Sequence, residues 1–160
     1  MYGPGHVGAA LFCYAPVAAA LTRSGEPALA LFGTGVAVAL STLPDADQFE
    51  VVPADHRGPT HTVWFVLGVA AVLAASGALV GLLAGRPAAL ATTAGSAALV
   101  SLASHLLADV ITPMGIRPFA PLSGWHHSFD LTPAKNPRAN AALLGLGTLF
   151  ALGCQIAVWP

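Results

Sequence analysis

The sequence predicts an all-α membrane protein, a polytopic bundle of about five transmembrane helices with its polar site at one membrane face. The first observation is composition: 56% of the 160 residues are hydrophobic, 8% are charged and the mean hydropathy is +0.73. A soluble domain carries about 25% charged residues. The second observation is that the apolar residues gather in long stretches, each close to the length that crosses a hydrocarbon core of about 30 Å. These stretches cover residues 7–21, 28–43, 62–83, 88–111 and 139–158.

The first two stretches are shorter than the rest, at about 15 and 16 residues against the roughly 20 that a spanning helix needs. They cross the membrane by including interfacial residues at their ends, or they form a tight hairpin against the longer helices; we favour crossing. No basic residue precedes Arg23, so the first stretch is not expected to be a cleaved signal peptide. Glycines throughout the stretches favour close helix packing in lipid. No linker or internal repeat divides the chain, so we expect one integral-membrane domain over residues 1–160.

Charge and cysteine placement exclude several classes of protein. Six Lys plus Arg against seven Asp plus Glu give a net charge of -1, so there is no basic field and we expect no nucleic-acid binding. Cys13 and Cys154 lie in apolar runs, where packing is a commoner role than a disulfide. A transporter for a metal or small solute is a less favoured alternative, because such proteins place ionisable groups near the membrane midplane and the midplanes here are mostly apolar.

Five crossings place the histidines of the chain at one membrane face. Loops alternate between the two sides, so residues 44–61 and 112–138 lie on the side of Met1, hereafter the N-terminal face. All six histidines lie in these loops or at the adjoining helix ends, and six of the seven acidic residues join them. The longer loops inflate this clustering, but both kinds of metal ligand still meet at one face. The histidines are His6, His56, His61, His105, His126 and His127, and the acidic residues are Asp45, Asp47, Glu50, Asp55, Asp109 and Asp130.

The first local motif is Leu43-Pro44-Asp45-Ala46-Asp47, which places two carboxylates just after a helix end. Carboxylates held off a helix by a proline can converge on a cation. The alternative is an ordinary solvated turn.

The second motif is His56-Arg57-Gly58-Pro59-Thr60-His61. Thr60 is predicted to cap the third helix and so to place His61 in its first turn, beside backbone N–H groups that favour an anion. Arg57 is a planar bidentate donor suited to a phosphate or a carboxylate. The alternative for Arg57 is contact with lipid headgroups.

The third motif pairs His105 with Asp109, four residues apart and therefore on one helix face, where they can bind one metal together or form a His–carboxylate pair. Ionisable residues are costly in a hydrophobic helix and are functional candidates by default. The helix is expected to end before Pro113, which leaves Asp109 near the mouth of the bundle.

Together the motifs supply the ligand types that zinc and related divalent metals prefer, histidine nitrogen and carboxylate oxygen. Five ligands from four helix ends are enough for two ions with water. The expected metal ligands are His6, Asp47, His61, His105 and Asp109.

Gly5-His6, the three motifs and the continuation Thr112-Pro113-x-Gly115 resemble the YdjM-type family of inner-membrane metal-dependent hydrolases, over about residues 5–122. That family is grouped distantly with zinc-dependent phospholipase C and P1 nuclease, helical enzymes whose clustered zinc ions cleave phosphodiesters. The resemblance implies a multi-pass protein of the inner, or plasma, membrane and a phosphoester substrate derived from membrane lipid. It also implies a zinc pair held by the five expected ligands, with Asp109 as the bridge and Asp47 beside the attacking water.

In the implied mechanism a metal-activated water attacks the phosphoester and Arg57 stabilises the charge that develops on phosphate. His56 either protonates the leaving group or orients a neighbour. A non-catalytic scaffold with a structural metal is the competing hypothesis. Basic residues number four on the N-terminal face and two opposite, which weakly favours a cytoplasmic site. Nothing in the sequence predicts the oligomeric state.

Two departures limit the resemblance. The soluble enzymes complete a third zinc site with further histidines and a glutamate, whereas no glutamate follows Glu50 here. His126 and His127 are more simply explained as interfacial residues. The soluble enzymes also use their N-terminal backbone as a ligand, a role not expected here because Met1 lies five residues ahead of His6.

Overall fold

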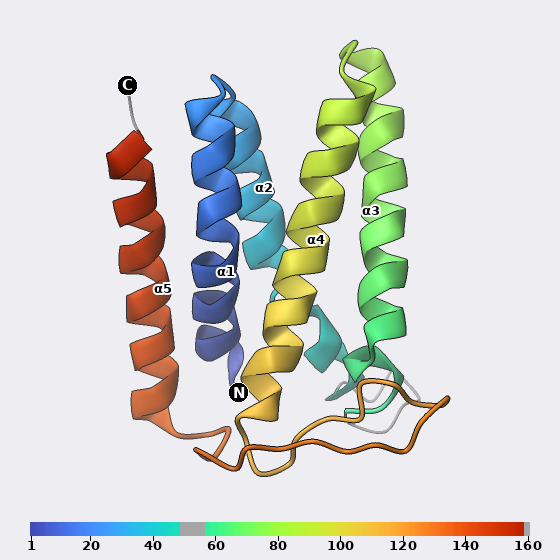
Figure 1. The fold of residues 1–160 in the computed structure, drawn as a ribbon, viewed down its shortest axis with the longest axis vertical. Coiled ribbons are helices and arrows are strands. Elements are labelled where there is room, and N and C mark those ends of the chain that lie inside the picture. Colours follow the sequence, from blue (N-terminus) through green and yellow to red (C-terminus); the bar gives the residue numbers. More distant parts are fainter. Residues whose placement is uncertain (49–56, 159–160) are drawn as a thin grey trace.

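The structure, a computed structural model, describes residues 1–48 and 57–158. Within these residues the secondary-structure elements are all helices (Figure 1). This confirms the all-α class. The longer elements are α1 (Gly3–Arg23), α2 (Pro27–Leu40), α3 (Val63–Leu83), α4 (Pro87–Val110) and α5 (Pro137–Val158). Two short 3-10 helices, η1 (Leu43–Gln48) and η2 (Pro59–His61), lie between α2 and α3.

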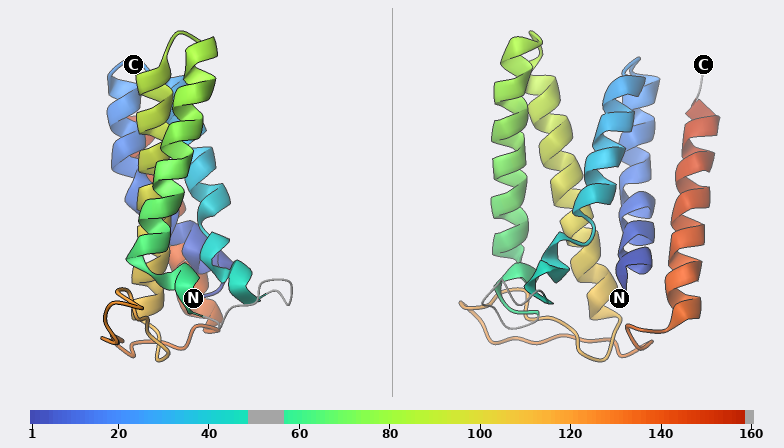
Figure 2. Two further views of the ribbon diagram at one scale, coloured as in Figure 1. Left: turned by 90° about the vertical axis from the view of Figure 1, so that its right-hand side faces the viewer. Right: turned by 180° about the vertical axis from the view of Figure 1, so that it is seen from behind.

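Helix α4 is the centre of the bundle and packs against α1, α2 and α3, while α5 packs mainly against the outer side of α1. Successive helices run in opposite directions, so the N-terminus, η1, η2 and the long connection from α4 to α5 gather at one end (Figure 2). This end is the N-terminal face of the sequence analysis.

Within residues 1–48 and 57–158, five elements are long and apolar enough to cross a membrane, as the sequence predicted. The first two are longer than expected. Helix α1 has 21 residues because it begins at Gly3, where Pro4 presets the backbone of the first turn. Helix α2 has 14 residues, but η1 continues it to give an apolar span of 22 residues, Pro27–Gln48.

The predicted boundaries hold at one helix end and fail at another. Helix α4 ends at Val110, ahead of Pro113, as expected. Helix α3 does not begin at a Thr60 cap: Thr62 is the N-cap, and its hydroxyl accepts the Phe65 N–H at 3.3 Å. The prediction for Thr60 was wrong because η2 inserts one 3-10 turn before the helix, which leaves His61 outside α3.

Close packing through glycine occurs where α1 crosses α5. A Cβ atom added at Gly147 would lie 2.0 Å from the carbonyl oxygen of Gly8, and one at Gly8 would lie 2.3 Å from the backbone of Leu143. Neither position can accept a side chain without a backbone shift. Cys13 and Cys154 are both free thiols.

Candidate metal centre

Four side chains converge at the N-terminal face in a group able to hold a metal ion: His6 from α1, Asp45 from η1, and His105 and Asp109 from α4. One ligand atom from each lies within 4.8 Å of every other. The side chains of His6, His105 and Asp109 are fully buried. Because α1, α4 and η1 meet at this end of the bundle, residues about one hundred positions apart in the chain share one polar site.

The spacing of these atoms is close to that of metal ligands. His6 Nε2 lies 3.6 Å from Asp45 Oδ2 and 3.6 Å from Asp109 Oδ1, while His105 Nε2 lies 3.8 Å from Asp45 Oδ1. Tetrahedral ligands about 2.0–2.2 Å from zinc stand about 3.3–3.6 Å apart. The four residues are therefore already close to the separation that a bound ion requires, and their nitrogen and oxygen donors fit zinc.

Contacts behind the imidazole rings fix their orientation. His105 Nδ1 lies 2.7 Å from the carbonyl oxygen of Ser41 at the end of α2, so its Nε2 is the atom presented to the group. The ring of His6 stacks on that of His105 with centroids 3.7 Å apart. Such outer contacts set the tautomer and direction of a metal-binding histidine.

His61 adds a third imidazole to the group. Its Nε2 lies 3.3 Å from Asp109 Oδ2 and 3.2 Å from His105 Nε2. Burial lowers the pKa of His61, but hydrogen bonding to Asp109 and Asp45, together with their negative charge, outweighs burial and raises that pKa above 6.5.

Asp45 and Asp47 take different positions from those expected. Asp45 faces the group, whereas Asp47 lies behind His61, 3.3 Å from its Nδ1. Asp47 Oδ2 also accepts the Arg57 backbone N–H and the Thr60 hydroxyl, each at 2.9 Å. Asp47 is an expected ligand from the sequence; in the structure Asp45 belongs to the four-residue group, and Asp47 contacts the far side of the His61 ring, where a carboxylate can orient a histidine.

Arg57 joins the group from the other side. Its Nη2 donates to Asp109 Oδ1 at 2.9 Å, and its Nη1 donates to Thr112 Oγ1 at 2.9 Å and to the carbonyl oxygen of Gly115 at 3.0 Å. Its backbone has a φ of 60°, a left-handed conformation that is costly for a residue with a side chain. Its buried Nε has no hydrogen-bond partner among the described residues.

A small cavity of about 230 Å³ opens beside this guanidinium. It is lined by Arg57, Met114, Gly115, Ile116, Arg117 and His126. Two arginines and a histidine make it a polar recess next to the metal group.

The remaining histidines are not part of the metal group among the described residues. His126 and His127 sit in the loop after α4: His126 Nε2 is 2.8 Å from the carbonyl oxygen of Met114, and the backbone of His127 pairs with Ile116. His56 falls outside the described residues, as do Glu50 and Asp55.

Met1 belongs to the site although the sequence analysis set it aside. Its amino group forms an ion pair with Asp109, and its carbonyl oxygen lies 2.8 Å from His6 Nε2. Asn140 of α5 holds this segment by accepting the Tyr2 N–H at 3.0 Å. No local sequence pattern predicts the contact of Met1 with Asp109, because this contact depends on how α1, α4 and α5 pack together.

Fold and site together define a multi-pass helical membrane protein with a buried histidine–aspartate group that can hold a metal ion. The family model for the YdjM inner membrane protein matches residues 1–159, and the chain belongs to this family. It is accordingly a multi-pass protein of the inner membrane. No curated protein and no solved structure matches the chain. The distant similarity to phospholipase C and P1 nuclease stays a prediction.

Proposed function

We propose that this protein is a membrane-embedded metal-dependent hydrolase that acts on a phosphoester through water activated by two divalent ions, with zinc the favoured metal. One observation carries the proposal: a buried group of histidines and carboxylates has metal-ligand spacing and lies within hydrogen-bond distance of an arginine. When bound, such ions lower the pKa of water from about 15.7 towards about 7 and neutralise charge on a phosphate.

The two oxygens of Asp109 suit it to bridge two ions. Oδ1 faces His6 at 3.6 Å, while Oδ2 faces His61 at 3.3 Å and His105 at 3.6 Å. One ion would take His6, Asp45 and Oδ1, and the other would take His61, His105 and Oδ2. This division needs no ligand beyond the side chains that already face one another.

Asp47 and Arg57 support this arrangement from outside it. Asp47, hydrogen-bonded to the Arg57 backbone and close to His61 Nδ1, holds the ring so that Nε2 faces Asp109. A carboxylate in that position raises the basicity of the histidine as a ligand. His56, outside the described residues, stays a predicted proton donor or orienting residue.

Charge balance favours an anionic substrate. Two carboxylates, from Asp45 and Asp109, would face the two divalent ions, and Asp47 lies behind His61. Three negative charges against two divalent ions and the guanidinium of Arg57 would leave the occupied site with excess positive charge. The recess beside Arg57 adds Arg117 at its rim. Because Arg57 presents planar N–H donors that match phosphate oxygens, a phosphate in this recess would be recognised geometrically as well as by charge.

The position of the site favours a substrate that reaches it from the membrane surface. The metal group lies at the end of the bundle where the N-terminus, η1 and the loop from α4 to α5 gather (Figure 1). A lipid-derived phosphoester presents its phosphate at that depth.

The test is to purify the intact protein in detergent, measure bound metal by mass spectrometry and assay hydrolysis of lipid phosphoesters and nucleotides. We expect activity that a chelator abolishes and that added zinc restores. Arg57→Lys keeps the charge but loses the planar fork, so metal content should stay near the parent value while turnover falls. Bound metal without hydrolysis of any phosphoester, under any metal supplied, would instead identify a scaffold with a structural metal.

A further inference from the structure

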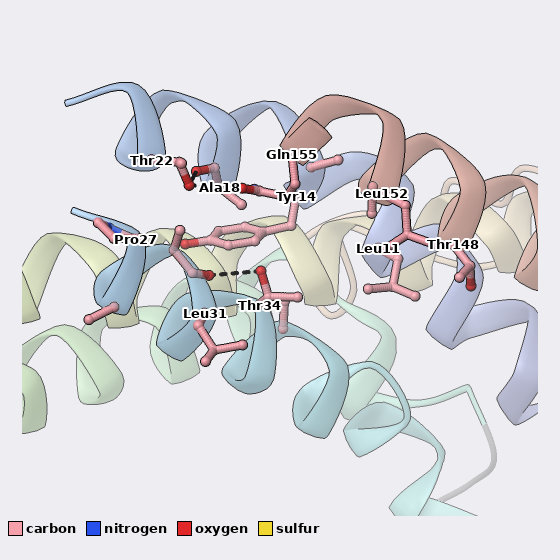
Figure 3. A pocket seen from close by; sticks show the side chains of 15 residues that line it. Leu11, Tyr14, Ala18, Thr22, Pro27, Leu31, Thr34, Thr148, Leu152 and Gln155 are labelled. Atoms are coloured by element: carbon pink, nitrogen blue, oxygen red, sulfur yellow. Dashed lines mark hydrogen bonds between the residues drawn. The ribbon is translucent and has the colours of Figure 1, made fainter. Parts of the chain in front are cut away.

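A second cavity, of about 520 Å³, lies between α1, α2 and α5, and none of the metal-group residues lines it (Figure 3). This volume falls within the range of about 300–1,000 Å³ that small-ligand pockets occupy. Its lining is almost entirely apolar and includes Leu11, Tyr14, Ala15, Ala18, Leu31 and Leu152.

The cavity exists because α1 separates its two neighbours. Helix α2 packs on one side of α1 and α5 on the other, and the strip of α1 between them carries the small side chains Ala15 and Ala18. At one end, Thr22 and Gln155 close the gap with a hydrogen bond of 2.8 Å. Towards the other end, α1 and α5 approach at Gly8 and Gly147.

Two of the hydroxyl groups near the cavity are engaged within the protein. A third, the buried Tyr14 hydroxyl, has no hydrogen-bond partner among the described residues, but it lies against Gly33, which does not line the cavity. The Thr34 hydroxyl donates to the Ala30 carbonyl oxygen at 2.8 Å, the contact drawn in Figure 3. The Thr22 hydroxyl donates a hydrogen bond to Gln155 Oε1. An occupant of this space therefore meets a mainly apolar surface.

The dimensions and position of the cavity match one leaflet of a bilayer. On α2 it extends from Pro27 to Ala37, which are ten positions apart, or about 15 Å at a rise of 1.5 Å per residue. Half of a hydrocarbon core of about 30 Å has the same thickness. The cavity begins at the face opposite the metal group, where α1 ends and α2 starts, and the exposed Leu31 and Leu152 show that it opens on the outer surface of the bundle.

A cation stands beside the Thr22 end of the cavity, without lining it. Arg23 is the last residue of α1, next to Thr22, and is exposed. The neighbouring basic residue at this face, Arg86, is ion-paired with Glu26, whereas Arg23 has no ion pair among the described residues. An arginine at the interface attracts an anionic headgroup.

We propose that the cavity binds one acyl chain of a phospholipid from the leaflet opposite the metal centre, with the lipid phosphate held by Arg23. The occupant is hydrocarbon because hydrocarbon surrounds a spanning helix, and tight packing rather than the hydrophobic effect retains it there. This site does not depend on the hydrolase proposed above, because it uses none of the metal-group residues.

The test uses intact protein in bilayers containing a phospholipid with a photoreactive group midway along one acyl chain. Light-induced adducts mapped by mass spectrometry should concentrate on the cavity-facing residues of α1 and α5. Ala151→Phe places a ring in the cavity and should reduce these adducts to background. Ala75→Phe makes the same change at an exposed position on α3 and should leave them at the parent level.

Arg23→Gln separates headgroup binding from chain binding. Loss of about 1 kcal/mol of attraction per arginine should lower the adduct yield about fivefold. If Ala151→Phe prevents folding, the smaller Ala151→Leu serves in its place. Adducts spread evenly over α3 and α5, or unaffected by filling the cavity, would overturn the proposal. So would a cross-link between two copies of the chain through the cavity, since a protein would then be the occupant.

Metal content measured on the same samples keeps the two proposals apart. We expect Ala151→Phe and Arg23→Gln to retain the parent metal content while giving fewer lipid adducts. If no phosphoester is hydrolysed but the adducts still map to the cavity, the hydrolase proposal fails and the lipid site stands. If metal binding is intact but no adducts map to the cavity, the lipid site alone is refuted.

Discussion

Asp45 and Asp47 offer a matched pair of substitutions that tests the metal centre directly. They are two residues apart in η1, and Asp→Asn removes the charge of each with little change of shape. Asp45 faces the ring nitrogens of His6 and His105 at 3.6 and 3.8 Å. Asp47 lies behind His61 instead, in contact with Nδ1. The two variants should therefore differ in metal affinity.

The magnitude follows from these positions. Removing a carboxylate that orients a metal-binding histidine costs about 10–100-fold in metal affinity, and Asp47→Asn should fall in that range. Asp45→Asn removes a direct ligand, so we expect a loss greater than about 100-fold, equivalent to more than about 2.7 kcal/mol.

The assay is competition for zinc between a chromophoric chelator and protein stripped of metal, with circular dichroism to confirm that each variant is folded. A larger loss in Asp47→Asn than in Asp45→Asn would make Asp47 the ligand and refute the assignment drawn from the distances. Unchanged affinity in both variants would refute the metal centre itself.

Three further predictions concern the same bundle. Gly147→Ala should lower the unfolding temperature through an overpacking cost of about 1–3 kcal/mol, because its Cβ meets the carbonyl oxygen of Gly8, whereas Gly145→Ala, with open space at its Cβ, should not. Asp109→Asn should destabilise metal-free protein by about 3–5 kcal/mol in denaturant titrations, since it leaves buried positive partners without their carboxylate; unchanged stability would contradict that ion-pair network. As the pH is lowered in titrations with zinc, the metal affinity should begin to fall while the pH is still above 6.5, because the pKa of His61 is raised and a protonated ring cannot bind metal.

The spanning helices were predictable because a membrane leaves few alternatives. A chain in hydrocarbon must satisfy its backbone hydrogen bonds internally, so a long apolar stretch becomes a helix. His105 and Asp109 were predictable for a related reason: a four-residue spacing fixes a common face once the helix is known. The ends of the first two spans were not predictable, since Pro4 and the 3-10 turn of η1 lengthen them by local geometry.

The choice between Asp45 and Asp47 could not be made from sequence. In a 3-10 helix each residue advances about 120°, so two residues that are two apart point in different directions. Which one meets the histidines depends on how η1 is set against α4 and η2, a tertiary relation with no local signal. The same limit explains Thr60: both Thr60 and Thr62 are good helix caps by type, and only the inserted η2 turn decides between them.

Arg57 shows why the second motif was only partly interpretable. Its chemistry was evident from the sequence, but its left-handed backbone was not, because glycine is the residue that accepts that conformation freely and Gly58 stands beside it with a φ of -84°. Such a conformation costs on the order of 1–3 kcal/mol and persists when surrounding contacts over-determine it. Those contacts are the Asp47 carboxylate on the Arg57 backbone and the Asp109 carboxylate on its guanidinium, at 2.9 Å each. One residue thus ties η1 to α4 through two carboxylates of the same polar site, so the conformation of Arg57 is a consequence of the assembled site and not of the His56–His61 motif that contains it.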